Sequence, residues 1–388
     1  MNETENTAEL FAEAEETLEQ TDKKCPQCGG TLDFNPETGE LICTYCGATV
    51  DIIDDANKKA KELDFNTAEN YASRDWGTET RTVMCKNCGA ETVYDAETVS
   101  GECPYCGSNQ VMDAGGESVM APGGVCPFTV TQSAASEGFG KWLRGKLFCP
   151  GAAKKAAKAG KMSGIYLPYW TFDTDTHSSY TARYGKEHTV RRGKETRVEI
   201  RWYHTRGFYN RFINDELVAA TGNHDKKMLE KIEPFDTENN LEYKPEYLAG
   251  FASERYTLGL NEGWDEAKRD IAKTIEADIC AKVRSEYHTS HVDSVRFSTD
   301  YRNVTYKYLL LPVWMSSFEY KGKTFRFMVN GRSGRVGGKY PISPLRVAIA
   351  VLLGLSAAAL FAYIFMSGEA DMAEIYIQNA ESYFQLMM

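Results

Sequence analysis

The longest run of apolar residues spans 347–366, where twenty residues follow one another without a charged side chain. At about 1.5 Å of rise per residue, a helix of this length matches the hydrocarbon thickness of a bilayer. A helix buried in the core of a soluble domain is the alternative, and the length of the run argues against it. We therefore expect one transmembrane helix over 345–366.

Upstream of this run, periodic patterns predict both helices and strands. A long helix is indicated over 264–287 by apolar residues at helical spacing: Trp264, Ile271, Ile275, Ile279 and Val283. A shorter helix is expected over 131–148. Strand patterns dominate 164–185, 196–212 and 304–338, with turn signals at Lys321-Gly322 and Asn330-Gly331. The pattern is typical of an α+β fold, in which a β-rich domain contains one long helix.

Two similar strings fall at the same point of two strand-rich stretches. They are Leu-Pro-Tyr-Trp at 167–170 and Leu-Pro-Val-Trp at 311–314. They suggest an internal repeat whose two β halves share one sheet or barrel around the long helix, although coincidence would also explain two short strings. Proline donates no hydrogen bond to a ladder, so sheet edges or bulges are expected there.

Eight of the eleven cysteines lie in two similar stretches, 25–47 and 85–107, and each stretch carries two Cys-x-x-Cys pairs followed by glycine. Two such turns joined by a hairpin supply the four tetrahedral ligands that zinc prefers. Redox Cys-x-x-Cys chemistry would not explain the paired partners. Four thiolates leave no open coordination position, so the ions are expected to be structural. We expect two structural Zn²⁺, one bound by Cys25, Cys28, Cys43 and Cys46 and the other by Cys85, Cys88, Cys103 and Cys106.

These features divide the chain into successive segments. We expect an acidic amphipathic segment (1–24), zinc ribbon 1 (25–47), a linker (48–84), zinc ribbon 2 (85–107), a flexible linker (108–124), an α+β cytoplasmic domain (125–340), the transmembrane helix (345–366) and a short extracytoplasmic tail (367–388).

Charge is distributed unevenly along the chain. Residues 1–124 hold 25 acidic and 8 basic side chains, whereas the remainder holds 30 acidic and 36 basic ones. The N-terminal part, which contains both cysteine-rich stretches, is therefore acidic, and negative charge is unfavourable for binding DNA. Basic residues precede the apolar run and only acids follow it, so positive-inside logic places the N-terminal bulk in the cytoplasm and the tail outside the cell membrane. The basic residues are Arg332, Arg335, Lys339 and Arg346. A cytoplasmic location also agrees with reduced thiols.

No catalytic constellation is visible in the sequence. The stretch 331–340 resembles a phosphate loop, but Ser333 stands where the first glycine is required and Tyr340 where Ser or Thr is required. The six histidines show no complete set of metal ligands and are expected to be structural or surface residues. Cys126, Cys149 and Cys280 are expected to be buried apolar groups rather than nucleophiles. The sequence therefore predicts a non-enzymatic protein.

One basic stretch leaves several interpretations open. Residues 183–211 hold nine Lys and Arg interleaved with aromatic side chains and only three acids. A solvated hairpin face, contact with anionic lipid head groups, and a nucleic-acid surface all fit this composition, and we favour lipid over nucleic acid. A nucleic-acid-associated role in replication or transcription through this surface is the alternative function.

Small residues mark one face of the apolar run. Ala350, Gly354, Ala358 and Ala362 recur every four residues and would allow close packing on a helix partner in the membrane. Such residues are common in transmembrane helices, so chance explains the stripe equally well.

The chain resembles the bacterial TFIIB-type double-zinc-ribbon membrane proteins, which are often likened to the helicase PriA (primosomal protein N′). Besides the two ribbons and the apolar run, the resemblance rests on motifs spread over the chain: 127–128 (PF), 166–173 (YLPYWTFD), 207–212 (GFYNRF), 233–240 (EPFDTENN), 250–256 (GFASERY), 310–314 (LLPVW) and 327–338 (FMVNGRSGRVGG). The likeness to the helicase is confined to the ribbon cysteines, because no motor motif accompanies them.

Proteins of this kind are found with SPFH-domain and phage-shock-type proteins, which they are thought to recruit to the membrane during envelope stress. The resemblance therefore implies an adaptor whose ribbons dock protein partners and whose apolar helix anchors it.

Overall fold

The computed structural model describes residues 24–52, 58–68, 80–85, 91–95, 111–113, 120–157, 162–192, 195–222 and 224–363. The N-terminal segment up to residue 23, the side chains of the expected second zinc site and the tail 367–388 lie outside the described residues. The chain divides into two compact units. The first contains Met1–Phe139, Ala159–Ser317 and Arg326–Gly338, and the second contains Gly140–Lys158, Phe318–Phe325 and Lys339–Met388.

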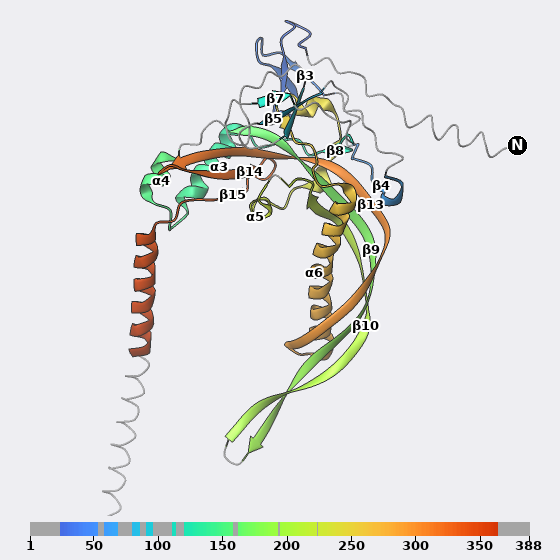
Figure 1. Ribbon diagram of the computed structural model, residues 1–388, viewed down its shortest axis with the longest axis vertical. Coiled ribbons are helices and arrows are strands. Elements are labelled where there is room, and N and C mark those ends of the chain that lie inside the picture. The colour runs from blue at the N-terminus through green and yellow to red at the C-terminus, as the bar shows by residue number, and fades with distance from the viewer. Residues whose placement is uncertain are drawn as a thin grey trace, which may run out of the picture. The chain divides into compact units, whose positions relative to one another are not determined.

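The described residues form a strand-rich mixture of helices and strands, which confirms the mixed fold expected from the pattern (Figure 1). A small sheet contains β1 (Leu32–Phe34), β2 (Leu41–Cys43) and β3 (Thr49–Val50). A twelve-stranded sheet contains β4 (Leu63–Asp64), β5 (Thr80–Cys85), β6 (Glu91–Asp95), β7 (Val111–Asp113), β8 (Gly124–Val125), β9 (Ser163–Arg192), β10 (Glu195–Ala219), β11 (Leu241–Glu242), β12 (Ala252–Ser253), β13 (His291–Tyr320), β14 (Lys323–Asn330) and β15 (Val336–Gly338).

Helices are fewer among the described residues. The α-helices are α3 (Gln132–Arg144), α4 (Gly151–Ala156), α5 (Lys226–Leu229) and α6 (Leu260–Tyr287), and a further helix spans Pro344–Tyr363. Short 3₁₀ turns are η1 (Phe65–Thr67), η2 (Thr237–Asn239) and η3 (Pro245–Leu248). The helices expected over 131–148 and 264–287 are confirmed as α3 and α6, and both expected turns connect strands, since β13, β14 and β15 follow one another as hairpins.

The central ladder joins β9 and β13, and it is buried on both faces over 165–172. Leu167 pairs with Leu311 and Tyr169 with Leu309, and these side chains belong to one apolar cluster. On the other face Trp170 pairs with Tyr308, with ring centroids 5.0 Å apart. Because both faces are covered, the strand sequence is a continuous apolar run rather than an alternating one.

The two Leu-Pro-x-Trp strings therefore lie opposite each other in one sheet. The carbonyl of Pro168 accepts a hydrogen bond from the N–H of Ala220, and that of Pro312 accepts one from Gly331. The N–H and C=O groups of a strand residue point to the same edge. The position at which each proline lacks an N–H therefore lies on the edge away from the β9–β13 ladder, and no hydrogen bond of that ladder is lost. Along that edge Pro168 falls between the stretches of β9 paired to β12 and to β10.

The long helix α6 covers one face of β9 and β10. Ile271, Ile275, Ile279 and Val283 are fully buried, and each such burial contributes about 1.5–3 kcal/mol. Beyond the end of α6, the β9–β10 hairpin continues as a two-stranded ribbon (Figure 1), in which the paired residues run to Arg192 and Glu195.

The described parts of the expected linker 48–84 form strands that pair with other parts of the chain. Residues 49–50 form β3, which pairs with β2 of the small sheet, and Leu63 and Asp64 form β4, which pairs with β13. Ala60 is buried in the apolar cluster, and its N–H donates to the side-chain oxygen of Asn240 at 2.9 Å.

Within the second unit, local contacts hold the start of the C-terminal helix. The Arg346 guanidinium donates to the carbonyls of Leu147 and Cys149 at 3.0 and 2.8 Å. Trp142 packs edge-on against Tyr340, with ring centroids 5.7 Å apart.

Candidate metal centre

The first pair of Cys-x-x-Cys turns folds into two matching knuckles. In the first, the N–H of Gly29 donates to the carbonyl of Cys25 at 2.8 Å, and in the second that of Gly47 donates to Cys43 at 3.0 Å. Both glycines have φ angles near the left-handed region, +71° and +73°. Side chains with a Cβ rarely adopt this conformation, which explains why glycine follows each pair.

The two knuckles bring the four sulfur atoms together. The Sγ atoms of Cys25 and Cys46 are 3.6 Å apart, those of Cys28 and Cys43 are 3.5 Å apart, and all four lie within 4.8 Å of one another. A tetrahedral ion with sulfur ligands at about 2.3 Å requires edges of about 3.8 Å. The four cysteines can therefore bind one metal ion.

The thiols of the cluster differ in pKa because they lie so close together. A hydrogen bond from the backbone N–H of Cys46 helps to lower the pKa of Cys43 to about 6. For Cys28, the hydrogen bond from Gly30 lowers the pKa, yet the sulfurs of Cys43 and Cys46 raise it to about 12. Four thiolates repel one another at this distance, and a bound cation removes that repulsion.

Phe34 joins this hairpin to the segment 247–251 of the first unit. Its side chain is buried against Tyr247 and Phe251, with ring centroids 5.7 and 6.5 Å away. Its N–H donates to the carbonyl of Ala249 at 3.1 Å. The aromatic residue between the knuckles therefore packs on protein instead of facing solvent.

The other residues considered in the sequence are not brought to this cluster. Of Cys85 the structure describes the backbone alone, and Cys88, Cys103 and Cys106 lie outside the described residues. Cys126 and Cys149 are fully buried, and burial raises the pKa of both thiols, which agrees with the expected apolar role. His288 caps α6, and His291 pairs with Glu187 at 2.8 Å, so these two histidines have separate roles.

A buried polar triad was missed by sequence reasoning. Nε2 of His224 lies 2.9 Å from one carboxylate oxygen of Glu254, and the Thr221 hydroxyl donates to the other at 2.5 Å. The side chains of His224 and Glu254 are 4% and 1% exposed. Thr221 and His224 come from the connection between β10 and α5, and Glu254 follows β12. Their sequence spacing matches no known motif, so no local signal could have found the triad.

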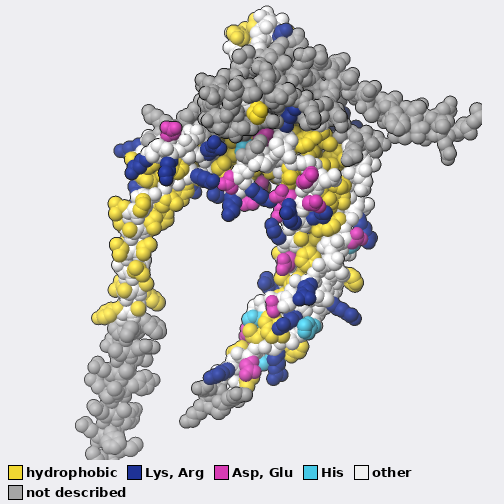
Figure 2. Space-filling model, in the orientation of Figure 1, with side chains coloured by type: hydrophobic (Ala, Val, Ile, Leu, Met, Phe, Trp, Pro, Cys, Tyr) yellow, Lys and Arg dark blue, Asp and Glu magenta, His cyan; other side chains and the backbone are white. Residues whose placement is uncertain are grey.

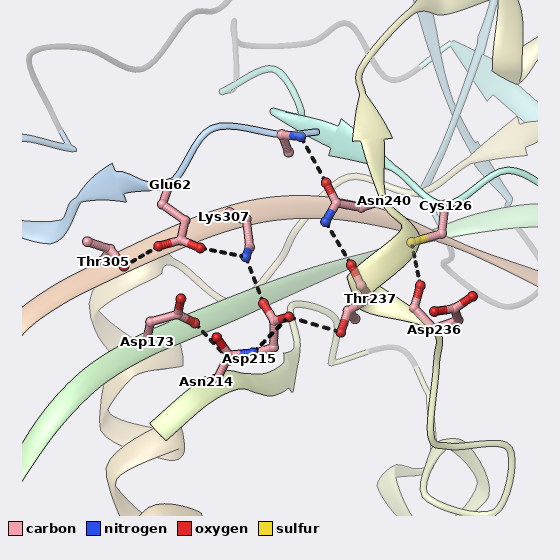
Figure 3. A network of polar contacts seen from close by, with 11 residues as sticks. Glu62, Cys126, Asp173, Asn214, Asp215, Asp236, Thr237, Asn240, Thr305 and Lys307 are labelled. Atoms are coloured by element: carbon pink, nitrogen blue, oxygen red, sulfur yellow. Dashed lines mark hydrogen bonds and ion pairs between the residues drawn. The ribbon is translucent and has the colours of Figure 1, made fainter. Parts of the chain in front are cut away.

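A second buried network surrounds Lys307 (Figure 3). Its ammonium lies 2.7 Å from Asp215 and 3.2 Å from Glu62, and its side chain is 7% exposed. The N–H of Asp215 donates to Asp173 at 2.7 Å. Burial raises the pKa of Asp173 to about 6, whereas for Glu62 the Lys307 ammonium outweighs the effect of burial and lowers the pKa. One cation therefore pairs with carboxylates from two segments, and the backbone N–H of Asp215 binds a third carboxylate.

Replacing this cation is expected to destabilise the first unit. Lys307→Met leaves the buried carboxylate of Asp215 without a counter-ion, which costs about 3–5 kcal/mol for a buried pair, whereas the half-exposed Glu62 adds little. Thermal unfolding followed by near-UV circular dichroism measures the loss. Lys226→Met is the matched control, because Lys226 is 56% exposed in its ion pair with Glu266 and such pairs contribute less than about 1 kcal/mol. Equal midpoints for the two variants would contradict the assignment.

Carboxylates also line a cavity of about 560 Å³ beside α5 and α6. Lys273 lies 2.7 Å from Asp270, while Glu216 and Glu233 face the same space. Burial raises the pKa of Glu216 to about 7 and also raises that of Glu233. Among the described residues, the four cysteines are the group whose ligand atoms come close enough to share one ion.

The raised pKa of Glu216 predicts a pH-dependent stability. The folded state binds this proton more tightly than the unfolded state, so the wild type loses stability as the pH rises from about 4.5 to about 7. Glu216→Gln removes the effect and should gain about 1 kcal/mol on the wild type between pH 5 and pH 8, allowing for solvent screening. Urea unfolding at both pH values measures it. Glu276→Gln, on the exposed side of α6, is the control, and an equal gain there would refute the prediction.

The C-terminal helix is long and apolar enough to cross a membrane. It spans Pro344–Tyr363, has a mean hydropathy of 2.2 over its most apolar stretch, and none of that stretch is buried by the described residues. In Figure 2 the visible surface of this helix consists mostly of apolar side chains. The last three residues of the expected span, 364–366, lie outside the described residues.

Comparison with known proteins gives one informative relative. No family model matches the chain, and no solved structure matches it. The uncharacterized protein YdjG of Bacillus subtilis (strain 168) is 31% identical over 325 residues, which cover 84% of this chain and 91% of that protein. Identity at this level over nearly the full length of both proteins shows common descent. The chain therefore belongs to the same protein family as YdjG.

Proposed function

We propose that the chain is a non-enzymatic, zinc-binding adaptor that is anchored in the cell membrane and docks cytoplasmic partner proteins. The observation that carries this proposal is the combination, in one chain, of a four-cysteine cluster closed on itself and an exposed apolar helix of membrane-spanning length. A closed cluster offers a substrate no open coordination position, so it serves structure and recognition.

Zinc is the proposed ion for chemical reasons. Four thiolates at tetrahedral spacing favour zinc among the common divalent ions, whereas calcium and magnesium prefer oxygen ligands. The first ion is bound by Cys25, Cys28, Cys43 and Cys46. The matching spacing of Cys85, Cys88, Cys103 and Cys106 supports a second structural Zn²⁺, as in the resembled double-ribbon proteins.

The proposed orientation places residues 1–346 in the cytoplasm. Lys339 and Arg346 flank the start of the C-terminal helix, and the residues after it carry only acids. Basic residues are retained on the cytoplasmic side of a span. Cysteines kept reduced for zinc binding also agree with a reducing compartment.

The proposed partners are proteins. Neither stretch between the knuckles of a ribbon contains Lys or Arg, so the ribbons lack the charge that phosphate contacts require. Tyr45 lies within the second knuckle, between Cys43 and Cys46, and its side chain, 79% exposed, offers an aromatic contact. SPFH-domain and phage-shock-type membrane-stress proteins are the expected partners from the resemblance.

A crosslinked, nuclease-treated pull-down from membranes tests the adaptor. The full chain and Tyr45→Ser are compared, because this change leaves all four cysteines in place. We expect membrane-stress proteins to be recovered with the wild type and to be depleted with the variant, while Tyr363→Ser on the C-terminal helix behaves as the wild type. Recovery of replication or transcription proteins that disappear after nuclease treatment would replace the adaptor by the nucleic-acid alternative.

A further inference from the structure

An apolar stripe runs along β10. Five apolar side chains of this strand are exposed: Val198 (61%), Ile200 (40%), Trp202 (39%), Phe208 (75%) and Phe212 (58%). All five occupy even-numbered positions of one strand, and alternate strand residues share a face. The stripe is therefore a continuous feature of one side of the hairpin rather than a set of scattered exposed residues.

The helix α6 covers the opposite face. The Tyr209 hydroxyl donates to Asp278 of α6 at 3.0 Å, and the Thr205 hydroxyl lies 2.8 Å from that of Tyr287. Tyr184, the partner of Tyr203, stacks on Tyr287 with ring centroids 3.9 Å apart. From Tyr203 to Arg211 the odd-numbered residues of β10 thus face α6, whereas the even-numbered residues over 198–212 are all exposed in the described part of the chain.

Positive charge accompanies the stripe. Residues 183–211 carry nine Lys and Arg against three acids. The Arg183 guanidinium lies 5.0 Å from the ring centre of Trp202, on the stripe's own face. Figure 2 shows basic, apolar, acidic and histidine side chains mixed along the arm that contains this hairpin. Bases beside aromatic and aliphatic groups are the pattern of surfaces that lie at a lipid head-group boundary.

We infer that this face of the β9–β10 hairpin binds the surface of an anionic bilayer. Trp202 and the two phenylalanines would enter the head-group region, and the surrounding arginines would contact lipid phosphates. The inference rests on the proposed membrane anchor, which keeps every exposed surface of the chain at a high local concentration of lipid.

Other occupants fit the surface less well. Val198 and Ile200 give a nucleic acid nothing to stack on, although single strands bind through aromatic side chains and bases. A second copy of the chain would have to oppose one basic hairpin to another, and like charges directly opposite each other are unfavourable. The combination of aliphatic groups with net positive charge favours a lipid surface.

A photocrosslink placed in the stripe identifies the occupant directly. The full chain with Phe208→p-benzoylphenylalanine is reconstituted in nanodiscs of phosphatidylcholine with or without phosphatidylglycerol. We expect lipid adducts at this position in the anionic nanodiscs, with a several-fold loss in their absence. The yield should also fall when salt is raised from 0.1 M to 1 M, since the screening length shrinks from about 10 Å to about 3 Å. The matched control is Tyr209→p-benzoylphenylalanine, which faces α6 and should give few adducts.

Two readouts separate this inference from the membrane anchor. Recovery of the chain with the nanodisc scaffold reports the C-terminal helix, and the lipid adduct reports the hairpin. Arg191→Glu combined with Arg206→Glu should reduce the adduct several-fold while the chain stays in the nanodisc. A chain that is recovered without lipid adducts at residue 208 overturns the inference, as do adducts to a second copy, to another protein or to nucleic acid in cell membranes.

Discussion

Cys43→Ser is expected to release the metal ion from the first cluster and to unfold residues 24–50 while the first unit keeps its core. The three strands of the ribbon contain eight residues and bury few apolar side chains, chiefly Leu32, Phe34 and Leu41. So small a core cannot offset the conformational entropy of folding. Zinc binding contributes roughly 10–16 kcal/mol in comparable peptides, so folding of the ribbon depends on the ion.

Metal content per chain measures the first half of this prediction. Plasma emission spectrometry should find about one ion fewer in Cys43→Ser than in the wild type, because each set of four thiolates binds one ion. Chelation of the wild type should have the same local effect, seen as faster amide exchange in 24–50. Cys280→Ser, a cysteine of α6 outside the cluster, is the control and should keep the full content. Unchanged metal in Cys43→Ser would rule out the four-thiolate assignment.

The parts of this fold that follow from sequence are those whose signal is local. The knuckles are set by a cysteine spacing and a following glycine, and α6 by one apolar residue per turn from Trp264 to Val283. The turns at Lys321-Gly322 and Asn330-Gly331 depend on neighbouring residues alone. Each of these elements was predicted because adjacent residues in the chain determine it.

The charged networks could not be predicted, because they join residues that are distant in sequence. Lys307 forms an ion pair with Glu62, which is 245 residues away in the sequence. The Tyr166 hydroxyl donates to the carbonyl of Tyr247, which is 81 residues away. The hairpin of β9 and β10 shows the same limit, since its two strand patterns were recognised but not their pairing over more than twenty residues. Whether the apolar residues of β10 face a core or solvent depends on where α6 lies, which no local pattern encodes.

Leu352→Arg together with Leu355→Arg should release the protein from membranes. Both leucines lie near the middle of Pro344–Tyr363, and each is 63% exposed. Exchanging leucine for arginine at the centre of a span costs about 3–4 kcal/mol per site on insertion scales. Two exchanges therefore disfavour insertion by more than a thousandfold, since about 1.4 kcal/mol corresponds to tenfold.

Membrane flotation after carbonate extraction measures the release. The control is Leu345→Arg, which places the same charge at the end of the helix, where the long side chain reaches the head groups at little cost. If the helix belonged instead to a soluble core, the wild type would already fail to float and the double variant would lower the thermal stability of the protein. A double variant that floats as the wild type does would contradict a membrane span. Loss of flotation in the double variant alone, with an unchanged near-UV circular dichroism spectrum, would establish the helix as the anchor and show that tertiary packing is intact for binding studies.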